Sequence, residues 1–346
     1  MNTTMPNPRV GCVIVRDGNI VGEGRHERAG EPHAEAHALR QAGDAARGAD
    51  VYVTLEPCSH HGRTPPCAQA LIDARVSRVV AAMADPNPKV SGGGLRLLQA
   101  SGIAAVSGLM ETQARQLNPG FIMRMTRGRP WLTLKVAASL DGGTALANGA
   151  SQWITGPEAR SDVQRQRARS CAILTGIGTV LADDPQMTVR ELEIGRQPLR
   201  MVVDSHLRIP LNARILQGGN TMIVCIEGDG EKKAQLRAMD VTLLELPESD
   251  GVVCLATLMR ALAEREINEV LVEAGAILNG ALLRSGLVDE LLLYYAPALL
   301  GGDALGMFAL PPLTEMAQRI DLDILGIDRV GQDIRVRAKP LIENKK

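Results

Sequence analysis

The residues with the clearest chemical potential are a histidine, two cysteines and a glutamate near the start of the chain. The motif His-Ala-Glu is followed by Glu-Pro-Cys and then by a second cysteine. One imidazole and two thiolates can supply three ligands to Zn²⁺ and leave the fourth position for water. Zinc lowers the pKa of such a water to about 7, and a nearby carboxylate can transfer its proton. The expected zinc ligands are His33, Cys58 and Cys67, and the expected proton-transfer residue is Glu35.

Short helices and strands are expected to position these four residues. Residues 33–41 are rich in alanine and predict a helix, with Pro32 at its start. Cys67 is expected to begin a helix over 67–74, where the helix dipole favours a thiolate. Residues 51–55 (VYVTL) predict a buried strand that ends just before the Glu-Pro-Cys motif. Alternating strands and helices predict an α/β layer with a partly parallel sheet.

A second α/β domain is expected after the basic segment 123–130, which contains Gly and Pro and is interpreted as a domain junction. The length of 346 residues is sufficient for two domains. Strand-like runs lie at 131–137, 172–174, 200–203, 222–225, 269–273 and 290–295, with helical stretches at 158–169 and 255–266.

Composition excludes several classes of function. The net charge is -1 and only 2% of residues are aromatic, so the chain lacks the basic and aromatic surface of a dedicated nucleic-acid-binding protein. It has no apolar run of about 18 residues, so we expect no membrane span. Residues 1–9 lack the apolar stretch of a signal peptide. Six scattered cysteines do not form a disulfide scaffold, and we expect a cytoplasmic protein.

Other interpretations of the metal-site residues carry less support. The cysteines alone fit a buried thiol pair or a structural zinc site, but His33, Glu35 and Pro57 stand in the register of the H-x-E…P-C signature of zinc deaminases. His33 and His37 could share one helix face as in a zincin, but that motif needs Glu where Ala34 stands. Eight residues (SHHGRTPP) separate the two cysteines instead of the usual two, and such a cationic loop suits a phosphate-bearing substrate.

The second half indicates a ligand site less clearly. Gly176-Ile177-Gly178 begins a dinucleotide-like motif, but Leu181 occupies the position of the third glycine. The segment 273–275 (EAG) follows an apolar strand and precedes a helix over 277–283, so it places a helix N-terminus where phosphate can bind. The guanidinium groups of Arg167 and Arg190 could also hold a phosphate, although each is by itself typical of a solvated surface.

The motifs together resemble the bifunctional deaminase/reductase family of riboflavin biosynthesis over essentially the whole chain. In the first half the matching motifs are PNPRVGCVIV, GEPHAEAHAL, YVTLEPCSHHGRTPPC and DPNPKVSGGG. In the second half they are LKVAASLDG, SQWIT, TGIGTVLADDP, VVDS, VEAG and VDELLLYYAPALLG. The resemblance implies a cytidine-deaminase-like three-layer α/β/α domain over residues 1–125. A dihydrofolate-reductase-like α/β domain would follow over residues 130–346.

For the first domain the resemblance implies zinc-dependent deamination of a diamino-(phosphoribosylamino)pyrimidinone. Water would attack the ring carbon that bears the 2-amino group, and ammonia would leave. Glu35 would move the protons. The residues expected to hold the base or its phosphate are Asn7, His26, His60 and Arg63.

For the second domain the resemblance implies NADPH-dependent reduction of the ribosyl side chain at C1′. The expected substrate contacts are Ser151, Arg167, Arg190 and Glu273, and the expected cofactor contacts are Trp153, Thr179, Asp183, Ser205 and Gly275. Lys135 and Asp141 also stand in matching motifs near the expected hydride path, without an assigned chemical step. Many relatives carry Arg where Gly143 stands, so any phosphate contact there is lost.

Three further expectations follow. Family members begin with a helix before the Pro-Asn-Pro motif, whereas five residues precede Pro6, so we expect that helix to be absent and apolar surface to be exposed on one sheet face. The apolar run 291–300 suggests a sheet that pairs between subunits of a homo-oligomer. Two rival functions are a nucleoside or nucleic-acid deaminase, and a zinc-stabilised binding module attached to an active reductase.

Overall fold

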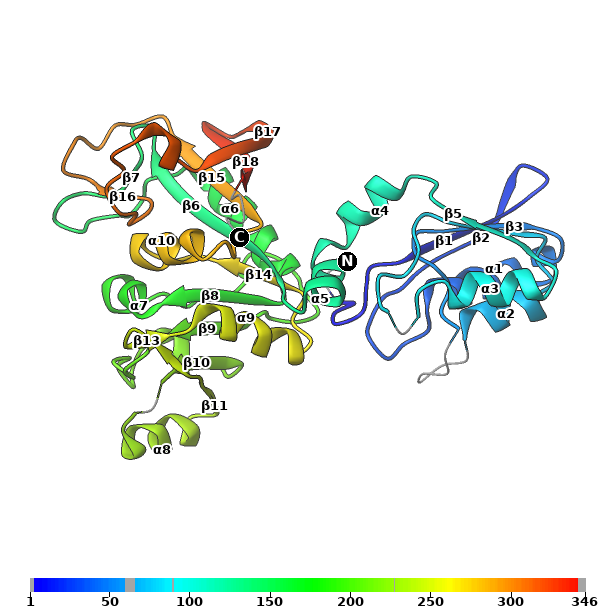
Figure 1. Cartoon of the computed structure of the whole chain (residues 1–346), viewed down its shortest axis with the longest axis horizontal. Helices are drawn as coiled ribbons and strands as arrows, with labels where there is room; N and C mark the ends of the chain where they lie inside the picture. Colours follow the sequence, from blue (N-terminus) through cyan, green and yellow to red (C-terminus); the bar gives the residue numbers. More distant parts are fainter. Residues whose placement is uncertain (1–2, 60–65, 89, 227, 342–346) are drawn as a thin grey trace. The chain divides into compact units, whose positions relative to one another are not determined.

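The chain divides into two compact units, Met1–Arg129 and Pro130–Lys346, in a computed structural model. The structure describes residues 3–59, 66–88, 90–226 and 228–341. Each unit has its own sheet (Figure 1). Each also has its own hydrophobic core. The expectation of a two-domain α/β protein is therefore confirmed.

The first unit is built on a five-stranded sheet of order β2-β1-β3-β4-β5. The hairpin β1–β2 turns at Asp17 and Gly18, which both have positive φ and so match the twist of the strands. β1 pairs antiparallel with β3, whereas β3, β4 and β5 run parallel. The strands are β1 (Gly11–Arg16), β2 (Asn19–Arg25), β3 (Asp50–Val53), β4 (Arg78–Ala81) and β5 (Ala104–Ser107).

Three helices cover one face of this sheet (Figure 1). They are α1 (Ala34–Ala42), α2 (Cys67–Asp73) and α3 (Gly93–Ala100), and the short 3₁₀ turn Gly43–Ala46 follows α1. Two glycines of β2 allow α1 to approach closely. A Cβ at Gly22 would lie 2.3 Å from the Ala38 carbonyl oxygen, and one at Gly24 would lie 2.2 Å from that of Ala34. This close packing fixes the N-terminus of α1, where the expected metal ligand and proton-transfer residue lie.

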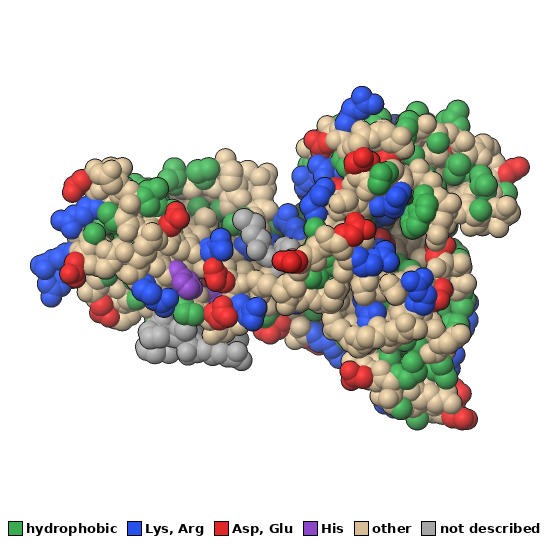
Figure 2. All heavy atoms as spheres, turned by 180° about the vertical axis from the view of Figure 1, so that it is seen from behind, with side chains coloured by type: hydrophobic (Ala, Val, Ile, Leu, Met, Phe, Trp, Pro, Cys, Tyr) green, Lys and Arg blue, Asp and Glu red, His purple; other side chains and the backbone are tan. Residues whose placement is uncertain are grey.

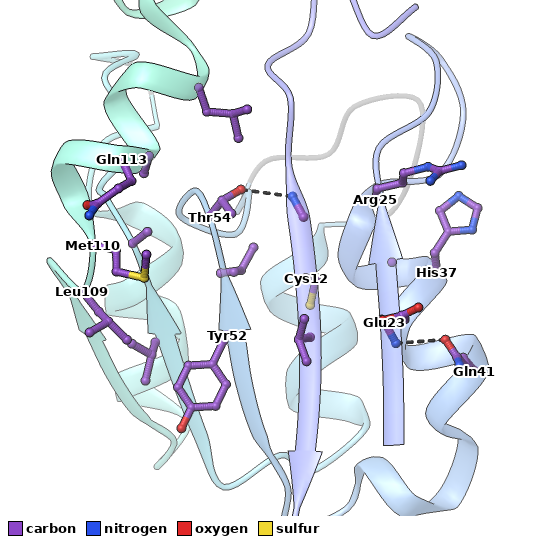
Figure 3. Close-up of a pocket in the computed structure, with 18 of the residues that line it drawn as sticks. Cys12, Glu23, Arg25, His37, Gln41, Tyr52, Thr54, Leu109, Met110 and Gln113 are labelled. Atoms are coloured by element: carbon purple, nitrogen blue, oxygen red, sulfur yellow. Dashed lines mark hydrogen bonds between the residues drawn. The ribbon is translucent and has the colours of Figure 1, made fainter. Parts of the chain in front are cut away.

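The opposite face of the sheet carries a groove of about 840 Å³. Leu109, Met110 and Gln113 lie on one side of it, at and before helix α4 (Glu111–Leu117), and Arg25 and His37 lie on the other (Figure 3). Helix α5 (Pro119–Arg127) follows and occupies most of the segment interpreted as a junction. None of the expected zinc ligands lines the groove.

The second unit is built on a nine-stranded sheet of order β11-β10-β9-β8-β14-β6-β15-β18-β17. In this order, each strand from β11 through β15 runs parallel to its neighbour. Strands β18 and β17 add an antiparallel ribbon at one edge. The strands are β6 (Trp131–Ser139), β8 (Ala172–Gly176), β9 (Leu199–Val203), β10 (Thr221–Cys225), β11 (Val241–Glu245), β14 (Glu269–Val272), β15 (Glu290–Ala296), β17 (Asp321–Val330) and β18 (Asp333–Leu341).

Helices cover both faces of this sheet. α9 and α10 pack on one face, α7 and α8 pack on the other over β8–β10, and α6 packs on that second face over β15. The helices are α6 (Pro157–Arg169), α7 (Ile177–Asp183), α8 (Gly230–Ala238), α9 (Leu255–Glu264) and α10 (Ala276–Arg284). Two small ribbons pair β7 (Gly143–Ala145) with β16 (Leu305–Gly306) and β12 (Glu248–Ser249) with β13 (Val252–Val253), and 3₁₀ turns lie at Arg214–Leu216 and Met316–Gln318.

The apolar run 291–300 begins inside the sheet of its own chain and not at an edge of that sheet. β15 contains the first part of this run, and both of its edges are occupied, by β6 and by β18. The strand continues a parallel sheet, which explains its apolar character on both faces. β17 is instead the free edge on this side of the sheet.

Surface charge and helix length are two general features of the described residues. On the face drawn in Figure 2, basic and acidic side chains are interspersed over both units. Among the described residues, no helix combines the length and the apolar character that crossing a bilayer requires.

A buried polar network attaches α6 to the sheet and provides a test of the fold. The Tyr294 hydroxyl donates a 2.6 Å hydrogen bond to the buried Asp162 carboxylate, which also accepts one from Arg335. Tyr294→Phe is expected to lower the free energy of unfolding by about 2 kcal/mol, the usual contribution of a hydrogen bond to a charged group. Chemical denaturation would measure this change.

Tyr295→Phe is the matched control, because no described residue makes a hydrogen bond to that neighbouring hydroxyl in the structure. It should change the free energy of unfolding much less. Equal effects of the two substitutions would contradict the network.

Candidate active sites

The predicted zinc ligands meet at one place in the first unit. The His33 Nδ1 atom lies 3.2 Å from Cys67 Sγ and 3.6 Å from Cys58 Sγ. These three donor atoms all lie within 4.8 Å of one another. Tetrahedral zinc with bonds of the usual length separates neighbouring nitrogen and sulfur ligands by about 3.6 Å. The donor set and its spacing therefore fit a zinc ion.

Each ligand is positioned by the end of an element. His33 is the N-cap residue of α1, Cys58 follows β3, and Cys67 is the first residue of α2. The Cys67 amide donates a 3.3 Å hydrogen bond to Cys58 Sγ, and the Ala68 amide donates a 3.1 Å bond to the Cys58 carbonyl. The N-terminus of α2 thus holds the side chain and the backbone of Cys58, and its dipole favours thiolate.

The electrostatics of this cluster favour a bound cation. A hydrogen bond from Cys67 lowers the pKa of Cys58 to about 4, whereas the same bond and burial raise the pKa of Cys67. Two thiols this close resist ionising together unless a positive ion lies between them. Glu35 is 3% exposed, and burial raises its pKa. A carboxyl group with a raised pKa beside the metal ligands is suited to accept and return a proton.

Two of the expected substrate-contacting residues lie against the cluster. The His26 ring meets the His33 ring edge to face, with 5.3 Å between their centroids. Its Nδ1 lies 3.2 Å from the Pro32 carbonyl, and its Nε2 lies 3.0 Å from the Asn7 amide nitrogen. Burial lowers the pKa of His26, so a neutral ring that donates to Pro32 and accepts from Asn7 satisfies both contacts. His60 and Arg63 lie outside the described residues.

A second cluster of charges lies in the second unit. Arg167 of α6 forms a forked ion pair with Glu273, at 2.5 Å from Nε to Oε1 and 3.0 Å from Nη2 to Oε2. Lys135 Nζ lies 3.8 Å from the same carboxylate. Lys135 is paired in the sheet with Leu292, which faces α6, so its side chain lies on the α6 side of the sheet. Strand β6, helix α6 and the residue after β14 therefore converge on one charged centre.

Burial and charge oppose each other in this centre. Burial alone would raise the pKa of Glu273, but the charges of Arg167 and Lys135 outweigh it and hold the pKa at about 2. Burial lowers the pKa of Lys135, and the Glu273 carboxylate offsets only part of that shift. Glu273 is therefore a permanent anion at neutral pH, beside a lysine that releases its proton more readily than usual.

Other expected residues of the second unit lie around the carboxyl ends of its parallel strands. Gly275 is the N-cap residue of α10, and a Cβ there would lie 3.7 Å from Thr179 Oγ1, so these two residues are neighbours. The Ser151 hydroxyl lies 3.4 Å from an Asp183 carboxylate oxygen. The Arg190 amide donates to Gln164 of α6, the helix that carries Arg167.

The other two expected cofactor residues, Trp153 and Ser205, contact different residues. Trp153 is 70% exposed and stacks on Arg160, whose guanidinium carbon lies 4.7 Å from the ring centroid. The Ser205 hydroxyl accepts a 3.1 Å hydrogen bond from the Val253 amide.

Two residues acquire a definite place only in the structure. Asp141 accepts hydrogen bonds from the Ser139 hydroxyl and from the amides of Leu300 and Gly301, which lower its pKa to about 2. It thereby joins the loops that follow β6 and β15. Glu56 lies between the expected site residues Glu35 and Cys58 in sequence, has no predicted role, and is buried. A glutamate directly before Pro-Cys at the end of an apolar strand was the available signal.

Comparison with known proteins agrees with this geometry. Residues 130–336 match the family model of the RibD C-terminal domain, and residues 1–83 match the cytidine and deoxycytidylate deaminase zinc-binding region. The riboflavin biosynthesis protein RibD of Escherichia coli is 53% identical over 345 residues, covering 96% of this chain and 93% of that protein. RibD of Haemophilus influenzae is 46% identical over 351 residues, covering 98% and 93%.

Solved structures extend the similarity to three dimensions. Acinetobacter baumannii RibD, in one crystal form, has a TM-score of 0.92 at 46% identity and covers 99% of this chain and 94% of its own. The diaminohydroxyphosphoribosylaminopyrimidine deaminase/5-amino-6-(5-phosphoribosylamino)uracil reductase of Thermotoga maritima has a TM-score of 0.86 at 33% identity and covers 98% and 94%. The chain belongs to the RibD family of bifunctional deaminase/reductases of riboflavin biosynthesis.

Proposed function

We propose that this chain performs two consecutive steps of riboflavin biosynthesis. Residues 1–125 deaminate 2,5-diamino-6-(5-phosphoribosylamino)pyrimidin-4(3H)-one, and residues 130–346 reduce the product to 5-amino-6-(5-phosphoribitylamino)uracil. The observation that carries the proposal is the convergence of His33, Cys58 and Cys67 within 4.8 Å, with Glu35 buried two residues from the histidine. The similarity to RibD proteins over nearly the whole chain supports both steps.

In the deamination step the protein holds the reactants and moves protons. His33, Cys58 and Cys67 would hold the zinc ion, which would supply an activated water. Glu35 would take a proton from the attacking water and deliver it to the ring nitrogen, and the remaining hydroxyl proton would pass through Glu35 to the departing amine. The C–N bond to the 2-amino group breaks as the C–O bond is completed, and ammonia leaves. Asn7 and His26 hold the base beside the metal ligands, and His60 and Arg63 contribute to the same binding region.

In the reduction step the charged centre holds the substrate. Glu273 and Arg167, with Arg190 and Ser151, bind the pyrimidine and its phosphorylated side chain, and Lys135 lies next to them. NADPH, when bound, supplies the hydride that the ring-opened ribosyl group accepts at C1′. The exposed N-terminus of α10 at Gly275 offers backbone N–H groups to its pyrophosphate, beside the Thr179 hydroxyl. Asp183, Ser205 and Trp153 complete the cofactor contacts.

The ribbon β17–β18 supports a homo-oligomer. Its register places Ile324 and Ile327 on the same face as Ala338 and Val336 of the partner strand. The exposed apolar residues of this ribbon include Leu322, Ile324, Leu325, Ile327 and Ile334. The opposite face carries a charged ladder that includes the Asp328–Arg335 pair. A sheet with one polar and one apolar face normally buries the apolar one, and β17 is an open edge.

The six free cysteines fit a cytoplasmic location.

Glu35→Gln tests the deamination step. The amide cannot accept and return a proton, so ammonia release from the diamino substrate should fall by roughly 10²–10⁴-fold. Bound zinc, measured by elemental analysis, should remain, and NADPH oxidation with the deaminated intermediate should be unchanged. Glu23→Gln, at the groove on the opposite sheet face, is the control and should keep full activity.

The outcome separates this proposal from its rivals. Full ammonia release by Glu35→Gln would indicate a structural zinc site and contradict the proposal. Efficient deamination of cytidine or tRNA by the wild-type protein would favour a nucleoside or nucleic-acid deaminase.

Glu273→Gln tests the reductase centre. Loss of the carboxylate removes a charged substrate contact, and truncating one partner of a buried charged contact in a binding site costs about 3 kcal/mol, or roughly 100-fold in affinity. We expect kcat/KM for the deaminated intermediate to fall by about this factor, while NADPH affinity, measured by fluorescence titration, is retained. Glu290→Gln removes a strand glutamate that pairs with Arg337 and should leave both values unchanged. Loss of NADPH affinity alone would place Glu273 in the cofactor site instead.

Ile327→Glu tests the proposed subunit contact. Ile327 is 64% exposed on β17, and a charge there should reduce the oligomer to a monomer in sedimentation velocity runs. Ile20→Glu changes an isoleucine that is 63% exposed in the first unit and should leave the assembly intact. A monomeric wild-type protein, or equal effects of both substitutions, would refute this contact.

A further inference from the structure

Glu56 is a buried carboxylate that binds only backbone groups among its described contacts. Its side chain is 3% exposed. Oε2 accepts hydrogen bonds from the amides of Asp85 and Gly92, at 3.0 and 2.9 Å. Oε1 accepts from the amides of Gly94 and Leu95, at 2.9 and 3.2 Å. Four N–H groups therefore saturate one carboxylate.

These four amides belong to the start of α3 and to the loop that leads into it. The N-cap residue Gly92 has φ 72° and no side chain to cap the helix. The first amides of a helix lack intrahelical partners, and an anion placed there is favoured by the helix dipole. Glu56 supplies that anion from a distant part of the chain. A buried carboxylate that accepts several N–H bonds is stabilised without a basic side chain.

Helix α3 also packs directly against Pro57 and Ser59, the residues on either side of Cys58. A Cβ at Gly94 would lie 1.9 Å from the Pro57 carbonyl oxygen, and one at Gly93 would lie 2.7 Å from Ser59 Oγ. The residues on either side of Cys58 therefore pack on the first turn of α3. On the N-terminal side of Cys58, the Glu56 amide donates a 3.0 Å hydrogen bond to the Met83 carbonyl. The backbone on both sides of Cys58 is therefore fixed by contacts with other parts of the first unit.

We propose that Glu56 is a positioning residue for deamination, acting through the backbone of Pro57 and Cys58. Its carboxylate fixes Asp85, Gly92 and the N-terminus of α3 against the residues around Cys58. These contacts hold Cys58 Sγ close to the donor atoms of His33 and Cys67, as a shared zinc ion requires. The inference rests on the proposed zinc site of this domain.

The geometry makes Glu56→Gln a sharp test. Glutamine has nearly the same shape, but it has one acceptor oxygen and one NH₂ group. Because each oxygen of Glu56 accepts two amides, either orientation of the glutamine sets its NH₂ group against two N–H donors. The loop and α3 must then separate, and Cys58 loses its fixed position.

The experiment measures metal affinity as well as turnover. Zinc affinity of the full chain is obtained by competition with a chromophoric chelator, and ligand geometry from the visible spectrum of the Co²⁺-substituted protein. Glu56→Gln should weaken zinc binding and deaminase kcat by about 10–100-fold, the usual effect of losing a group that orients a metal ligand. The Co²⁺ bands should shift or weaken. NADPH oxidation with the deaminated intermediate should not change.

Leu98→Ala is the matched control. It removes a fully buried side chain of α3 and so destabilises the same helix without touching the Glu56 hydrogen bonds. It should keep the Co²⁺ spectrum and the zinc affinity. Equal loss of zinc affinity in both variants would show that Glu56 only stabilises α3, and it would overturn the inference. An unchanged Co²⁺ spectrum and unchanged deaminase turnover in Glu56→Gln would also overturn it. If the wild-type protein itself bound no zinc, the proposed function would fail instead.

If Glu56→Gln does not accumulate as folded protein, Gly94→Ala provides the second test. It retains the carboxylate but forces α3 away from Pro57, because the added Cβ meets the Pro57 carbonyl. The inference requires the same shift of the Co²⁺ bands and a similar loss of zinc affinity. Wild-type values in this variant would overturn it.

Discussion

Burying a carboxylate costs free energy unless its charge is compensated, and this constraint organises both units of the chain. Glu56 is compensated by four backbone amides. Glu273 is compensated by a guanidinium and an ammonium group. Asp162 uses a tyrosine and an arginine. Each solution joins segments that are distant in sequence, so the compensation of charge also fixes which elements meet at each site.

The two sites use this constraint differently. In the first unit the Glu56 carboxylate orders the backbone at the start of α3. The carboxyl group of Glu35 has a raised pKa, because burial is the largest effect on it. In the second unit the same balance runs the other way, and two cations keep the pKa of Glu273 at about 2. One carboxyl is thus suited to exchange protons and the other to hold a permanent charge. Their roles follow from their surroundings rather than from their residue type.

Local sequence patterns were sufficient to identify much of the first site. The expected zinc ligands lie near the ends of helices and strands that short stretches of sequence predict, such as the alanine-rich helix α1 and the apolar strand β3. The motif therefore predicted which side chains would meet. The second site was harder to identify, because Lys135, Arg167 and Glu273 come from three elements with no fixed spacing. Residue type alone suggested Arg167 as a phosphate contact, and the resemblance to a family indicated both Arg167 and Glu273 as substrate contacts.

The sequence by itself determined the candidate metal ligands, the two α/β units and the family, because these depend on residue type and on short-range periodicity. The tertiary structure decided the partners of Glu56, the place of Lys135 beside Glu273, and the position of β15 inside the sheet with β17 at its edge. The physical reason is the sequence separation of the residues involved. The hydrogen bond between residues 56 and 94 joins residues far apart in the chain, and the order of the parallel strands depends on how the connecting segments cross the sheet. No local sequence pattern encodes either feature.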